Sequence, residues 1–192
     1  MPETDDTTPT PSRTGVSARA LVLVGVVAVL VYLADQGAKV LALSNLELNR
    51  TVPFIGELLQ LHLVKNAGAA FSLGSNSTWI FAIIASLVAI GLVVFARRIR
   101  SLGWASVFGL LLGGTLGNLS DRLFREPGFG VGHVVDFFQL YGFPAIFNVA
   151  DVGITSAMVL FILLTIRGVN LDGTRVARVP KSRRVDAPSD AA

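Results

Sequence analysis

The sequence contains no cysteine and has few charged residues. Without cysteine among its 192 residues, the chain has no disulfide framework, thiolate nucleophile or cysteine metal site, and its redox compartment stays undetermined. Only 15% of the residues are Asp, Glu, Lys or Arg, whereas 52% are hydrophobic. This composition is ill suited to a soluble monomer and is typical of a membrane protein. We therefore interpret the chain as one integral membrane domain with polar tails.

Metal-ligating residues are also scarce. The two histidines, His62 and His133, lie in a strand-like segment and a glycine-flanked loop, and neither belongs to an HExxH motif with a third ligand. The formal net charge of +3 does not indicate nucleic acid, because the basic residues lie beside apolar segments. We expect no metal, no cofactor and no nucleic-acid partner.

Long apolar stretches are what the sequence does contain. A helix needs about 20 mainly apolar residues to cross the hydrocarbon core of a bilayer. Four stretches meet or approach this length, at residues 18–38, 79–96, 102–119 and 147–166. The first has arginines at 13 and 19, before its apolar run, but that run is long and has no small-residue cleavage pattern, so we interpret it as a retained anchor rather than a signal peptide.

The basic residues predict the orientation of these spans. If the N-terminus is cytoplasmic, 11 of the 16 Lys and Arg residues fall on the cytoplasmic side, as the positive-inside rule requires. Residues 97–101 then form a tight cytoplasmic turn between the second and third spans. We expect both termini in the cytoplasm. The basic residues expected outside are Lys39, Arg50, Lys65, Arg122 and Arg125.

The polar segments divide the chain into a core and two tails. Residues 1–17 and 169–192 have compositions that cannot bury a core, so we predict disordered cytoplasmic tails around a membrane domain at 18–168. The basic second tail is expected to contact anionic lipid headgroups. Within the external loop at 41–78, residues 59–63 alternate apolar and polar side chains. We predict a small antiparallel sheet on the outer membrane surface.

Carboxylates converge at the outer ends of the spans. With the predicted topology, Asp121 ends the third span, Asp151 lies in the first turns of the fourth, and Asp35 lies near the outer end of the first. Asn118 and Asn148 each precede an aspartate by three residues, a spacing that places amide and carboxylate on one helix face. Two neighbouring aspartates share one proton, so one can deprotonate water while the other protonates a leaving group.

Other features near the acids support or compete with this interpretation. Glycines at 113, 114 and 117 allow close helix approach in lipid. Structural alternatives stay open: Asp121 with Arg122 as an interfacial ion pair, Asp35 with Lys39 as an i, i+4 anchor at the interface, and Asp136 as a solvated loop residue. We also expect Trp79 and Trp104 to be interfacial anchors.

Two other function classes remain possible from these residues alone. Intramembrane carboxylates also serve as relays in proton-coupled transporters and channels, although the chain has few spans and no internal repeat. A nonenzymatic scaffold is the third class, but it gives no reason for two Asn-x-x-Asp elements. No GxSG, HExxH or GxGD element of other intramembrane proteases is present.

Five blocks, in order, resemble a known family, the lipoprotein signal peptidases or type II signal peptidases. They are ADQGAK at 34–39, KNAGAAFS at 65–72, GGTLGNLSDR at 113–122, GHVVDF at 132–137 and FNVAD at 147–151. The resemblance covers residues 35–157. It implies four transmembrane helices with an external β-cradle, and thus an all-α membrane fold with a small β element.

The resemblance also implies an activity and a set of site residues. The activity is that of a metal-independent aspartic endopeptidase that removes the signal peptide of a prolipoprotein just before its diacylglyceryl-modified cysteine. The implied catalytic pair is Asp121 and Asp151. The chain departs from the family at Lys65, where arginine is common, and lysine lacks the planar donor fork. Substrate-binding or supporting roles are expected for Asp35, Lys39, Asn66, Gly68, Asn118, Arg122, Asp136, Asn148 and Ala150.

The same resemblance places the protein in the bacterial cytoplasmic membrane. Its expected partners are a diacylglyceryl-prolipoprotein substrate and membrane lipids, and we expect a monomer. The active site is expected near the extracytoplasmic face, where water reaches the scissile bond.

Overall fold

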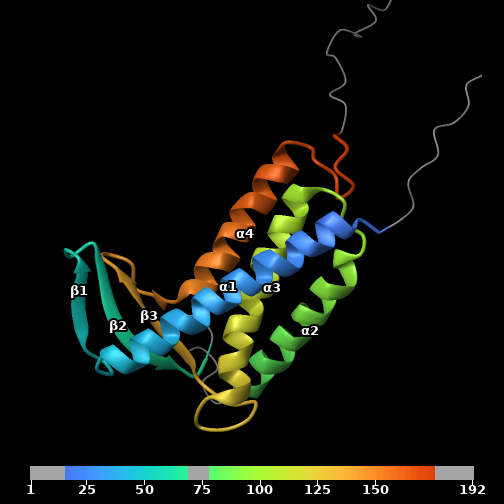
Figure 1. Cartoon of the computed structure of the whole chain (residues 1–192). Helices are drawn as coiled ribbons and strands as arrows, with labels where there is room; N and C mark the ends of the chain where they lie inside the picture. Colours follow the sequence, from blue (N-terminus) through green and yellow to red (C-terminus); the bar gives the residue numbers. More distant parts are fainter. Residues whose placement is uncertain (1–15, 69–77, 176–192) are drawn as a thin grey trace, which may run out of the picture.

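Four apolar helices form the body of the molecule. A computed structural model describes residues 16–68 and 78–175, and within these ranges four helices are long and apolar enough to cross a membrane. Figure 1 shows them side by side. All four predicted spans are therefore confirmed as helices. They are α1 (Ala18–Asn45), α2 (Thr78–Ala96), α3 (Leu102–Phe124) and α4 (Val149–Ile166).

Helix α1 continues past the predicted end of its span at residue 38. Because Asp35 and Lys39 are polar, the sequence suggested that the helix left the membrane there, but both side chains are fully buried. The extra turns reach the sheet, where Ala42 packs with Leu63 and Val135 in a small apolar core. The added length thus joins the helical bundle to the external sheet.

Helix α3 is the centre of the bundle and contacts each of the other three helices. Small residues allow these contacts. A Cβ on Gly114 would lie 2.5 Å from the carbonyl oxygen of Ala150 on α4, and one on Gly117 would lie 2.6 Å from the Asp35 carboxylate on α1. In lipid the acyl chains are as apolar as the helix surfaces, so the hydrophobic effect does not drive helices together. Helices associate instead through close packing of their backbones. The glycines therefore set the spacing of α1, α3 and α4.

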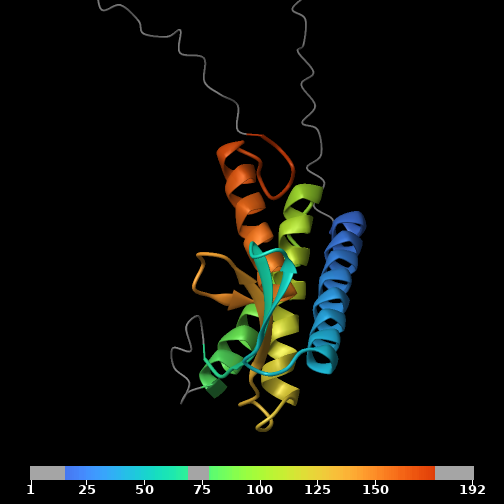
Figure 2. The same ribbon diagram turned by 90° about the vertical axis from the view of Figure 1, so that its left-hand side faces the viewer.

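A four-stranded antiparallel sheet lies at one end of the bundle (Figures 1 and 2). The strand order follows the sequence: β1 (Thr51–Ile55), β2 (Leu59–Asn66), β3 (Val134–Leu140) and β4 (Ile146–Phe147). The predicted strand at 59–63 is thus confirmed as the centre of β2, and the predicted fold class is confirmed as well. The second half of the sheet comes from the loop between α3 and α4, which the sequence did not indicate.

The opposite end of the bundle holds the start of α1 and the end of α4 (Figure 1). Residues 169–175, predicted as disordered tail, instead fold back on the α2–α3 turn. The carbonyl of Leu171 accepts hydrogen bonds from the backbone N–H groups of Arg100 and Ser101. Trp104 donates its indole N–H to Val169 at 2.8 Å and is buried, so it is a packing residue and not the expected interfacial anchor.

Some predicted features lie outside the described residues. These are most of the two tails, at 1–15 and 176–192, and the part of the external loop at 69–77. The last residues of the KNAGAAFS block, from Ala69 to Ser72, belong to that group.

Candidate active site

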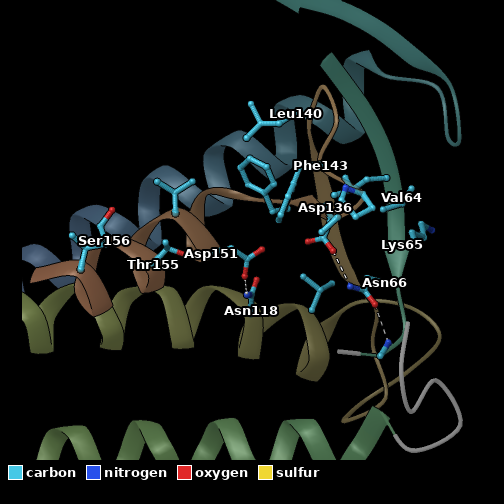
Figure 3. A pocket seen from close by; sticks show the side chains of 18 of the residues that line it. Val64, Lys65, Asn66, Asn118, Asp136, Leu140, Phe143, Asp151, Thr155 and Ser156 are labelled. Carbon is cyan, nitrogen blue, oxygen red and sulfur yellow. Dashed lines mark hydrogen bonds between the residues drawn. The ribbon is translucent and has the colours of Figure 1, made fainter. Parts of the chain in front are cut away.

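A cavity of about 880 Å³ opens between α3, α4 and the sheet. The carboxylates among its lining residues are Asp136 and Asp151, and the close view in Figure 3 shows both side chains directed into it. Toward the middle of α4 the lining becomes apolar, with Val159 and Leu163. A polar mouth with an apolar extension fits a substrate that is part peptide and part hydrocarbon.

Asp151 is held at the beginning of α4 by a reciprocal cap. The side chain of Asn148 accepts the backbone N–H of Asp151 at 3.1 Å, and one Asp151 oxygen accepts the backbone N–H of Asn148 at 3.1 Å. Such a capping box satisfies helix N–H groups that have no partner within the helix. The other Asp151 oxygen accepts the Asn118 amide at 2.9 Å. The carboxylate is therefore fixed at the cavity wall.

Asp136 is held by amide groups from two other elements. Its oxygens accept the side-chain amide of Asn148 at 2.6 Å and that of Asn66 at 2.9 Å. Asn66 reaches it because β2 and β3 pair with Val64 opposite Asp136. The residue is only 3% exposed. The sequence left a solvated loop position open for Asp136, but the β2–β3 pairing buries it.

Asn118 and Asn148 connect the two carboxylates into one network. The Asn148 amide donates both to Asp136 and, at 3.0 Å, to the oxygen of Asn118, whose own amide donates to Asp151. The Asn118 oxygen also accepts the Lys39 ammonium at 3.0 Å, and an ammonium can only donate. The orientation of the Asn118 amide is therefore determined, with its NH₂ group toward Asp151.

Burial raises the pKa of Asp136 to about 6 from an ordinary value of 3.8. The hydrogen bonds from Asn66 and Asn148 lower the pKa and so oppose this effect, whereas the negative charge of Asp151 adds to it. A carboxyl group with a pKa close to the working pH can exchange protons readily. Perturbed acids of this kind gather at functional sites.

Arg122 supplies a positive charge at the cavity. Its guanidinium donates to the carbonyls of Gly68 at 3.1 Å and Asn118 at 3.3 Å, and it lies over the ring of Phe81. Gly68 in turn donates its N–H to the Asn66 side chain. Within the described part of the chain, the buried Nε of Arg122 has no hydrogen-bond partner. Arg122, Gly68 and Asn66 therefore form one side of the site.

Asp121 does not lie at the cavity. It is fully buried, and its oxygens receive donors from Lys39, Arg125, Gln36 and the backbone N–H of Val135. The predicted partnership of Asp121 with Asp151 across one cavity is thus not what the structure shows, because both Asp121 oxygens are occupied by ion pairs and hydrogen bonds.

Lys39 is the centre of this second, buried cluster. Its ammonium lies 2.8 Å from Asp35, 2.8 Å from Asp121 and 3.0 Å from the Asn118 oxygen, so all three of its protons have partners. The expected i, i+4 pair of Asp35 and Lys39 exists, but both side chains are 0% exposed. The pair is an internal link between α1 and α3 and not an anchor at the lipid interface.

Asp35 extends the cluster to α4. Its second oxygen accepts the backbone N–H of Ala150 at 2.9 Å, which is one of the free N–H groups in the first turn of that helix. A carboxylate at a helix N-terminus is also favoured by the helix dipole. The contact between Asp35 and Ala150 thus fixes the beginning of α4 from the side away from the cavity lining.

The remaining predicted residues are easily placed. Lys65 pairs with Glu126 at 2.9 Å, with both side chains partly or largely in solvent. This single contact does not require the planar donor fork of an arginine. Across residues 16–68 and 78–175, no cluster of three His, Asp, Glu or Cys side chains could hold a metal ion. Thr155 and Ser156, which also line the cavity, went unnoticed in the sequence because isolated hydroxyls on a helix form no recognisable pattern.

A comparison with family models decides the family. The model described as signal peptidase (SPase) II matches residues 27–167. The chain belongs to the signal peptidase II family. It is accordingly a peptidase and a hydrolase, and with its four apolar helices it is a multi-pass protein of the bacterial inner membrane.

Individual proteins that are similar to this signal peptidase II family member agree with the family assignment. A lipoprotein signal peptidase of Leifsonia xyli is 60% identical over 86% of this chain and 76% of its own length. One of Rhodococcus jostii is 47% identical over 80% and 77%, respectively. A solved structure described as a bacterial membrane enzyme superposes with a TM-score of 0.71 at 26% identity, over 85% of this chain and 98% of that one.

Proposed function

We propose that this signal peptidase II family member cleaves prolipoproteins before a diacylglyceryl-modified cysteine, with Asp136 and Asp151 as its aspartic pair. The observation that carries the proposal is the pair of carboxylates at one cavity, linked through Asn148. Each accepts two hydrogen bonds that leave further lone pairs for a water molecule. The similarity to relatives named lipoprotein signal peptidases supports a prolipoprotein as the substrate.

The pair would act with one shared proton. The ionised carboxylate takes a proton from water, and the resulting hydroxide oxygen bonds to the carbon of the scissile carbonyl while the protonated carboxyl donates to its oxygen. The C–N bond then breaks. The leaving nitrogen receives the proton that came from water, and the carboxylate that protonated the carbonyl oxygen takes a proton back from it as the new carboxyl group forms. Asp136, with its pKa of about 6, is suited to hold the shared proton. The two carboxyls exchange this proton and titrate as one unit.

Arg122 and the amides support this chemistry. Charge from Arg122 offsets the negative carboxylates beside it, and its fixed donors hold Gly68 at the rim. Asn66, Asn118 and Asn148 keep both carboxylates in place before substrate arrives. A site organised in advance needs little rearrangement at the transition state.

The arrangement in the membrane follows from charge and geometry. We propose that the sheet and the cavity mouth face the extracytoplasmic side, with both termini in the cytoplasm. Arg97, Arg98 and Arg100 cluster at the α2–α3 turn, the end of the bundle opposite the sheet, in accordance with the positive-inside rule. We also propose that the protein acts as a monomer.

The activity is tested with purified protein and two versions of one prolipoprotein, with and without the diacylglyceryl group. We expect cleavage of the diacylated form only, at the bond before the modified cysteine, with no effect of a chelator. Equal cleavage of both forms would contradict the lipid requirement. Activity that EDTA removes and added metal restores would contradict the metal-free mechanism, and a transporter would cleave neither form.

A further inference from the structure

Two hydroxyl groups extend the site along α4. Thr155 and Ser156 line the same cavity as Asp151, and Figure 3 shows the three residues in succession on the helix. At about 1.5 Å rise per residue, the hydroxyl-bearing residues lie roughly 6 and 7.5 Å beyond Asp151 along the helix axis. They are therefore deeper in the bilayer than the proposed scissile bond. Both residues are exposed on the protein surface.

Neither hydroxyl has a hydrogen-bond partner among residues 16–68 and 78–175. Three other hydroxyls on the helices of this protein bond to the carbonyl four residues earlier, as membrane helices usually allow. Those hydroxyls belong to Ser86, Ser106 and Thr165, at 2.8, 3.1 and 2.9 Å. Thr155 and Ser156 thus keep donors available toward the cavity.

Apart from the carbonyls four residues earlier on the same helix, to which neither hydroxyl is bonded in this structure, a hydroxyl donor at this depth meets few acceptors. Within hydrocarbon an unsatisfied polar group is costly, so the acceptor is expected from the molecule that fills the cavity. Beyond the hydroxyls the wall is hydrocarbon only, formed by Val159, Leu160 and Leu163. From the outer side inward, α4 thus presents a carboxylate, two hydroxyls and then an apolar surface.

We propose that Thr155 and Ser156 bind the ester carbonyls of the diacylglyceryl group on the substrate cysteine. This inference rests on the proposed function. The lipid-modified cysteine has the same order of groups as the helix: a peptide bond at the carboxylates, ester oxygens next and acyl chains last. A signal peptide in helical form is the poorer match, because its backbone carbonyls are bonded within the helix and its side chains at this depth are apolar.

The test compares a diester prolipopeptide with a diether analogue that has the same acyl length and no carbonyls. The double variant Thr155→Val/Ser156→Ala keeps the shape of the wall and removes both donors. We expect its KM for the diester to rise about tenfold with kcat little changed, because the hydrogen bonds are made in both ground and transition states. For the diether, parent and double variant should have equal KM.

Two control variants separate recognition from folding. Thr155→Ser retains a donor and should keep the parental KM for the diester. Thr165→Val removes a hydroxyl of the same helix that bonds within the helix, and it should leave both substrates unaffected. Equal loss on diester and diether, or no loss on either, would overturn the ester assignment while the proposed cleavage stands. If the parent cleaves neither lipidated substrate, the proposed function fails and this inference fails with it.

Discussion

Four aspartates near the sheet end of the bundle have the same chemistry and different surroundings. Asp121 is saturated by cations and a backbone N–H. Asp35 binds Lys39 and the first turn of α4. Asp151 has only neutral amide donors and faces the cavity, as Asp136 does. A carboxylate paired with cations is a poor base, because the pairing stabilises its charged form. In the proposed mechanism, these surroundings separate the supporting acids from the reacting ones.

Substitution of single aspartates distinguishes these roles. We expect Asp136→Asn and Asp151→Asn each to reduce cleavage by at least about a thousandfold, since each removes an acid–base group, while the protein stays folded. Asp121→Asn should instead lower stability by about 3–5 kcal/mol, because Arg125 and Lys39 lose their buried partner. Cleavage rates and thermal unfolding of the three variants measure this. A stable Asp121→Asn protein without activity would return Asp121 to the catalytic pair.

The pH dependence reports the shared proton. If cleavage needs one proton on the pair, kcat/KM falls as the pH rises through the pKa of Asp136, about 6 in the free enzyme. The Asn66 hydrogen bond favours the charged form and lowers that pKa. Asn66→Ala should therefore shift the alkaline limb upward, by about one pH unit. A pH–rate profile of parent and variant checks this, and an unchanged limb would exclude Asp136 as the titrating group.

At the scale of elements, the buried cluster holds α1, α3 and α4 together. Lys39→Met would leave the carboxylates of Asp35 and Asp121 without their shared cation, so we expect a loss of about 3–5 kcal/mol in unfolding free energy. The matched control is Lys65→Met, which breaks the pair with Glu126 where the side chains are 40% and 84% exposed. An exposed pair contributes little to stability, because water screens both charges. Chemical unfolding in detergent compares the two, and equal losses would contradict the cluster's role.

Helix spacing connects packing to catalysis. A Cβ at Gly114 would meet the Ala150 carbonyl at 2.5 Å and Ile154 at 2.7 Å, so α4 has to move away from α3. We expect Gly114→Ala to lower stability by about 1–3 kcal/mol. It should also lower kcat, since Asp151 lies in the first turn of α4 and would move with that helix. Gly91→Ala on α2, where a Cβ meets nothing within 4 Å, is the control. Parental kcat in Gly114→Ala would show that the site tolerates the shift.

The sequence predicted the elements better than the site. Apolar runs of span length determine helices because lipid leaves the backbone no other way to pair its polar groups, and all four were found. The FNVAD motif likewise predicted Asp151 correctly at the beginning of α4. The burial of Asp136 at the cavity was missed because it depends on pairing between β2 and β3, whose residues lie about 70 positions apart. The burial of Asp121 away from the cavity was missed because its cations come from α1 and from Arg125, and periodicity does not show which charges meet.

At the scale of the whole molecule, the two ends of the bundle have opposite chemistry. The sheet, the cavity mouth and the acids lie at one end, and the arginine-bearing α2–α3 turn lies at the other with residues 169–175 folded over it. A hydrolase needs water at its scissile bond and an apolar path for its membrane-embedded substrate. The cavity joins both, since it runs from the sheet down the lipid-facing side of α4. The orientation of the bundle then decides which compartment supplies the water.

The absence of cysteine makes this orientation directly measurable. Glu57→Cys introduces one thiol at the exposed β1–β2 turn, Arg97→Cys one at the α2–α3 turn, and Ile90→Cys one on the lipid-facing side of α2. In intact spheroplasts, a membrane-impermeant maleimide should label Glu57→Cys and leave Arg97→Cys unlabelled until the membrane is opened. Ile90→Cys should stay unlabelled in both conditions, because hydrocarbon keeps its thiol protonated and out of reach. The reverse pattern for the first two variants would place the acids on the cytoplasmic side, where they could not act on a translocated substrate.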